Sequence, residues 1–82
     1  MGKLVGNYIQ QLRQRQGTSI RKLGSQVDLS PAHLSLLERG QREASIHTLY
    51  PLIKALGGNF RLALNLLARD AGVPEEELSH KL

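Results

Sequence analysis

The stretch from Ser19 to Gly40 constrains the fold most strongly, because it carries start and stop signals for two short helices in close succession. Ser19 can cap the first helix. Ser30 can cap the second, whose first position is then Pro31, where a missing N–H costs nothing. The chain must turn between them at Asp28, and Asp tolerates the left-handed backbone conformation better than most residues. The stretch therefore predicts two short helices joined by a tight turn, with Gly40 ending the second.

Apolar residues at helical spacing predict further helices on both sides of this stretch. One helix is expected over residues 4–16. Another is expected after Ser45, which can cap it, and before Gly57. Pro51 lies inside this segment, and proline is easily accommodated only near the start of a helix. We therefore expect this helix either to begin near Thr48 or to bend there.

Residues 59–72 fit two interpretations. Alternate positions are apolar, as in a strand, at Phe60, Leu62, Leu64 and Leu66. However, Asn59 is a good helix cap, and Gly72 is typical of a helix end. The run is also longer than most strands. We therefore predict a helix here.

The expected fold class is all-α, a compact bundle of five short helices, because a chain of 82 residues permits one small domain. We assign this domain to residues 1–72, with its core at residues 6–57. Residues 73–82 are expected to form either a short C-terminal helix or an acidic tail. Pro74 and the glutamates that follow it suit the first turn of such a helix, and a frayed tail fits equally well.

The charge distribution favours a polyanionic partner. Residues 1–69 hold ten of the eleven Lys and Arg residues but only three of the seven Asp and Glu residues. A basic body of this kind suits nucleic acid, although a solvated cationic surface would have the same composition. The three aromatic residues are too few for single-strand binding by base stacking. No segment is long and apolar enough to span a membrane, and no signal peptide is recognisable, so a cytoplasmic location is expected.

Catalytic and metal-binding patterns are not found in the sequence. There is no cysteine, and the three histidines are far apart. No metalloprotease, phosphate-loop or dinucleotide-binding motif occurs. We therefore expect neither an enzyme, nor a cofactor, nor a metal site.

Three short patterns together indicate a family. They are the Leu12-Arg13 pair, the Ser19-x-x-x-Leu23-Gly24 spacing, and Ser30-x-x-x-Leu34-Ser35-x-Leu37-Glu38-Arg39-Gly40. In this order and spacing, residues 6–57 resemble the Cro/C1-type (XRE) helix-turn-helix family. The resemblance implies a lambda-repressor-like DNA-binding domain, bacterial or phage-encoded and nucleoid-associated.

The resemblance also implies roles for individual residues. Arg13 and Glu38 match a family salt bridge, although two independent surface charges are the alternative. The positions that match base-facing residues are Pro31, Ala32, Ser35 and Leu36. The positions expected at phosphates are Ser19, Ser30, His33, Arg39, Gln41 and Arg42. The residues at the base-facing positions depart from the family, which often carries Gln, Arg or Asn there. Specificity is therefore expected to depend on Arg39, Arg42 and DNA shape.

The expected function is a sequence-selective regulator that binds double-stranded DNA as a homodimer, with the helix at about Pro31–Arg39 in the major groove. The apolar residues assigned to a dimer or partner interface are Phe60, Leu62 and Leu66. The alternative explanation for these apolar residues is that the C-terminal tail folds back and covers them. The alternative function is an antitoxin-like or other interaction module whose C-terminal apolar segment binds a partner protein, with DNA binding used for autoregulation.

Overall fold

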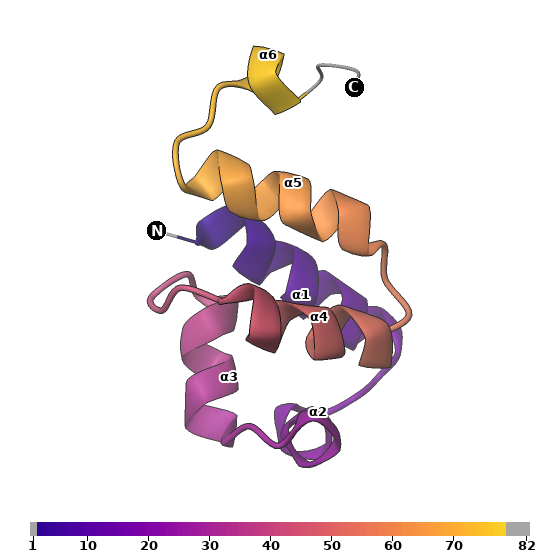
Figure 1. The fold of residues 1–82 in the computed structure, drawn as a ribbon. Coiled ribbons are helices and arrows are strands. Elements are labelled where there is room, and N and C mark those ends of the chain that lie inside the picture. The colour runs from indigo at the N-terminus through magenta and orange to yellow at the C-terminus, as the bar shows by residue number, and fades with distance from the viewer. Residues whose placement is uncertain (1, 79–82) are drawn as a thin grey trace.

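The computed structural model describes residues 2–78 and contains only helices within that range (Figure 1). The helices are α1 (Lys3–Arg15), α2 (Ile20–Val27), α3 (Pro31–Glu38), α4 (Ile46–Ala55), α5 (Phe60–Asp70) and α6 (Glu75–Leu78). The predicted all-α bundle is confirmed. The segment for which a strand was the alternative is the helix α5. Residues 79–82, the end of the expected acidic tail, lie outside the described range.

Side-chain caps define where most of the helices begin. The caps and the backbone N–H groups that donate to them are Ser19 and Lys22, Ser30 and His33, Ser45 and Thr48, and Asn59 and Leu62. Each cap is worth roughly 1 kcal/mol. The predicted cap at Ser45 is confirmed, so α4 begins at Ile46, and of the two alternatives the start near Thr48 is wrong. Pro51 sits inside α4 on its exposed side.

The turn between α2 and α3 is closed by backbone contacts. Asp28 has φ 59° and ψ 45°, the left-handed conformation predicted for it. The N–H of Leu29 then donates to the carbonyl of Gly24 at 2.9 Å. A Cβ atom on Gly24 would lie 2.4 Å from the carbonyl oxygen of Leu29, so a glycine inside α2 is required by the turn itself.

The core lies between α1 and the helices α2 to α5. Its fully buried side chains include Ile9, Leu23, Leu34, Leu37, Leu49, Leu52, Ile53 and Leu56. The helix α1 contacts α3 and α5, and Figure 1 shows α5 on one side of α1 with α2 and α3 on the other. Within residues 2–78, no helix is long and apolar enough to cross a membrane. The helices α1, α4 and α5 therefore support the α2–α3 pair from the side of the core, and the outer face of the pair is turned away from them.

Candidate nucleic-acid interface

The helices α2 and α3 each start at an exposed serine. Ser19 Oγ accepts a hydrogen bond from the N–H of Lys22, and Ser30 Oγ accepts one from the N–H of His33, both at 3.0 Å. A hydroxyl that accepts one bond can still donate its own proton, and a helix N-terminus carries partial positive charge. Each serine can therefore serve as a cap and hold an anion such as a phosphate.

The face that α3 turns away from the core is short and weakly polar. Pro31 and Ala32 are exposed, whereas His33, Ser35 and Leu36 are half-buried. Among the four predicted base-facing side chains, only Ser35 has a hydrogen-bonding group. Ala32 and Leu36 offer methyl groups that can pack on the methyl group of thymine. This face can contact bases, but it holds no side chain that recognises one base by two hydrogen bonds.

The orientation of α3 is fixed by an ion pair with α1. Arg13 Nε donates to Glu38 Oε2 at 2.6 Å, and Arg13 Nη2 donates to Glu38 Oε1 at 3.0 Å. Glu38 is only 6% exposed, and its hydrogen bond raises the pKa of Arg13 above the usual value. Arg13 Nη1 also donates to the carbonyl of Thr18 at 2.9 Å. One guanidinium thus joins α1, the segment before α2, and the last turn of α3, in the two-bond geometry that fixes an Arg–carboxylate pair most firmly.

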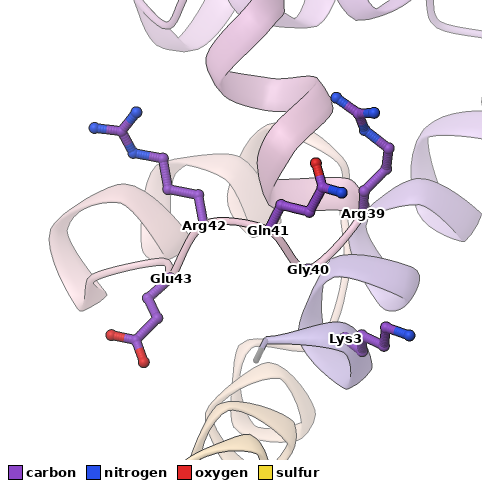
Figure 2. Close-up of a pocket in the computed structure, with 6 residues that line it drawn as sticks. All are labelled: Lys3, Arg39, Gly40, Gln41, Arg42 and Glu43. Carbon is purple, nitrogen blue, oxygen red and sulfur yellow. The ribbon is translucent and has the colours of Figure 1, made fainter.

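The loop after α3 carries exposed cationic and polar side chains. Gly40, with φ 72°, turns the chain sharply out of the helix. In Figure 2 the side chains of Arg39, Gln41 and Arg42 extend to one side of this loop, and Glu43 extends to the other. All four are exposed. The loop therefore presents positive charge at the C-terminal end of α3.

A sequence model of the helix-turn-helix family matches residues 9–62, about two-thirds of the chain. The chain belongs to the helix-turn-helix family. The Cro/C1-type resemblance is confirmed, and the chain is a DNA-binding transcriptional regulator. In the helix-turn-helix unit, α2 and α3 are the paired helices.

Known helix-turn-helix proteins resemble this chain in sequence and in structure. It is 40% identical over 57 residues to an uncharacterised HTH-type transcriptional regulator, y4dJ, of Sinorhizobium fredii, which covers 70% of this chain and 74% of the relative. The crystal structure of the clp gene regulator ClgR from Corynebacterium glutamicum superposes with a TM-score of 0.74 at 30% identity, over 84% of this chain and 73% of ClgR. A mutant of the restriction-modification controller protein C.Esp1396I shares the fold at 21% identity, with a TM-score of 0.70, over 85% of this chain and 91% of that protein.

The three apolar residues assigned to an interface do not share one exposed face of the helix-turn-helix domain. Phe60 and Leu66 are half-buried against the core, and only Leu62 is exposed, at 43%. The Phe60 ring meets the ring of Tyr50 edge-on, with centroids 5.0 Å apart. Tyr50 and Ile46 of α4 are themselves exposed. Exposed apolar surface therefore includes α4 as well as α5, whereas the interface predicted from the sequence lies within residues 60–66.

Lys3 was not among the site residues predicted from the sequence. This residue begins α1 and lines a shallow hollow together with Arg39, Gly40, Gln41, Arg42 and Glu43 (Figure 2). No spacing rule links residue 3 to residue 40, because they meet only when α1 packs on α3. A glycine that ends a helix is a weak hint of such an approach, since a turn alone also accounts for it.

Proposed function

We propose that this regulator binds double-stranded DNA sequence-selectively by inserting α3 in the major groove. The observation that carries the proposal is the arrangement of α3: its N-terminal turn is exposed, its inner face is buried, and its last turn is fixed to α1 by the Arg13–Glu38 pair. A helix held in this way can meet bases at a constant angle.

In this proposal, residues at the N-termini of α2 and α3 and in the loop after α3 bind phosphates. The N-termini of α2 and α3 supply Ser19 and Ser30, with His33 in the first turn of α3. The loop after α3 supplies Arg39, Gln41 and Arg42. Phosphate contacts provide affinity without sequence information. Selectivity would come from Ser35, from the apolar contacts of Ala32 and Leu36 with thymine, and from DNA shape.

We further propose that the regulator acts as a homodimer in the cytoplasm, on a two-fold operator with half-sites about one helical turn apart. The exposed apolar side chains of Leu62, Ile46 and Tyr50 support self-association. Residues 1–72 would form the DNA-binding domain, with residues 73–82 as an appendage. We assign it no catalytic role.

The same exposed apolar side chains favour a second candidate, an antitoxin-like module that binds a partner protein. The two candidates differ in solution. A chain that stays monomeric at high micromolar concentration but pairs tightly with a neighbouring gene's product would support the second.

Replacing both arginines of the loop after α3 tests the proposed phosphate contacts. We expect Arg39→Ala/Arg42→Ala to weaken duplex binding at near-physiological salt and to make the slope of log K against log salt shallower by roughly 1.8, since each neutralised phosphate contributes about 0.9. Titration of a fluorescent duplex at several salt concentrations measures both quantities. The matched control is Arg61→Ala/Arg69→Ala, which removes two exposed charges from α5. Unchanged affinity in the loop variant would contradict the proposed mechanism.

A further inference from the structure

Lys3 lies directly against the loop that follows α3. A Cβ atom on Gly40 would be 2.7 Å from Lys3 Cγ and 2.9 Å from Lys3 Cα. The first turn of α1 and the loop can approach this closely only because residue 40 has no side chain. Lys3 is exposed and therefore lines the same hollow as Arg39 and Arg42.

The first turn of α1 is anchored by the end of α5, which is distant in sequence but adjacent in space. Gly2, at the cap position, has no side chain that could accept a hydrogen bond. Its place is taken by Asp70, the last residue of α5. Asp70 Oδ1 accepts from the N–H of Leu4 and Oδ2 accepts from the N–H of Val5, both at 3.0 Å. A carboxylate is favourable at this position because it satisfies two unpaired donors and opposes the positive end of the helix dipole. The backbone that carries Lys3 is thereby held in place.

Two of the three acidic groups near this hollow are bound to other groups. The Glu38 carboxylate is bound to Arg13, and the Asp70 carboxylate is bound to the backbone of α1. Glu43 lines the same hollow from the other side of the loop than Arg39 and Arg42, so three cations there, Lys3 included, outnumber one carboxylate (Figure 2). The hollow between α1 and the loop therefore favours an anion. The hollow is shallow and open. It therefore suits a phosphate on the backbone of a long polyanion better than a small ion, which needs an enclosed site.

We infer that Lys3 is a phosphate-contacting residue. Lys3 would extend the set of residues that contact the DNA backbone from the loop after α3 to the start of α1. Asp70 is the residue that positions Lys3. This inference rests on the proposed function, because it assigns a further contact to the same DNA complex. The contact carries charge but no base recognition, so it adds affinity equally on all sequences.

Lys3→Gln tests the inference in the full chain, because it keeps most of the aliphatic stem and removes the charge. We expect the slope of log K against log salt to become shallower by about 0.9 and affinity at 0.15 M salt to fall roughly fivefold. The loss should be equal on a selected operator and on an unrelated duplex. Lys3→Arg should restore wild-type binding, and thermal melting should stay unchanged.

Arg69→Gln is the control for charge alone, because it removes an exposed cation from α5, on the other side of α1 from α3. It should leave the slope unchanged. Wild-type slope and affinity in Lys3→Gln would overturn the inference, as would an equal loss in Arg69→Gln. If Lys3→Gln has no effect but Arg39→Ala/Arg42→Ala does, only the Lys3 contact is wrong. If neither has an effect, the proposed function itself fails.

Discussion

Replacing Arg13 by alanine is expected to lower the free energy of unfolding by about 3–5 kcal/mol, because it leaves the Glu38 carboxylate buried without its partner. The third hydrogen bond of the guanidinium, to the carbonyl of Thr18, is lost as well. For a domain of this size, each kcal/mol shifts the melting temperature by roughly 4–8 °C, so the expected decrease exceeds about 10 °C. Chemical and thermal unfolding followed by circular dichroism measure the effect.

Arg15→Ala is the matched control for this variant. Arg15 lies on the same helix and has the same charge, but it is exposed, and such surface changes usually stay within about 0.5 kcal/mol. A melting temperature of Arg13→Ala that equals that of Arg15→Ala would show that the pair contributes no more than two independent surface charges.

Gly6→Ala is expected to cost stability and DNA affinity together. A Cβ atom on Gly6 would lie 2.2 Å from the carbonyl oxygen of Leu37 and 2.9 Å from that of Glu38. Both contacts are with backbone, so no change of rotamer relieves them, and α1 and α3 must move apart. Alanine gains about 1 kcal/mol of helix propensity, whereas forcing extra volume into a packed contact costs about 1–3 kcal/mol, and a backbone clash belongs at the upper end. The net effect is a loss of about 2 kcal/mol.

The comparison with Asn7→Ala isolates this effect, because Asn7 is the next residue of α1 and is exposed. That variant should unfold and bind DNA like the wild type. Denaturant unfolding and duplex titration on both variants provide the measurements. If Gly6→Ala proved as stable as Asn7→Ala, or bound DNA equally well, α1 and α3 would not be held together by the close contact described here.

Local signals in the sequence predicted the features that depend on neighbouring residues. Ser19, Ser30 and Asn59 are caps as expected, and Asp28 adopts the left-handed conformation. Each of these depends on hydrogen bonds or steric limits within a few residues, so the residue type alone carries the information. The residues at 59–72 could be assigned to a helix for the same reason.

Contacts between distant segments could not be predicted in this way. Asp70 caps a helix that begins at residue 3, and nothing in either segment signals the other. The close approach at Gly6 likewise depends on the packing of α1 on α3. On α5, the spacing of the apolar residues cannot tell which of them meet the core. Phe60 and Leu66, assigned to an interface, are half-buried against the core for this reason.

The base-facing surface raises the question of how this regulator selects its site. Its side chains include one hydroxyl, on Ser35, and otherwise methyl and methylene groups. Because contacts of this kind discriminate weakly, we expect the preferred sites to be rich in thymine at the contacted positions and to depend on the deformability of the bases between half-sites.

Selection of binding sites from a pool of random duplexes tests the central claim most directly, because the protein itself then chooses its operator from all sequences. If α3 enters the major groove and the regulator binds as a dimer, the enriched sequences should share a two-fold motif with half-sites about 10 base pairs apart. The enrichment should be lost in a variant with Ser35 and Leu36 replaced by glutamate, whose charge would face the DNA. Sequences that show no enrichment, or the same enrichment in that variant, would contradict DNA recognition through α3.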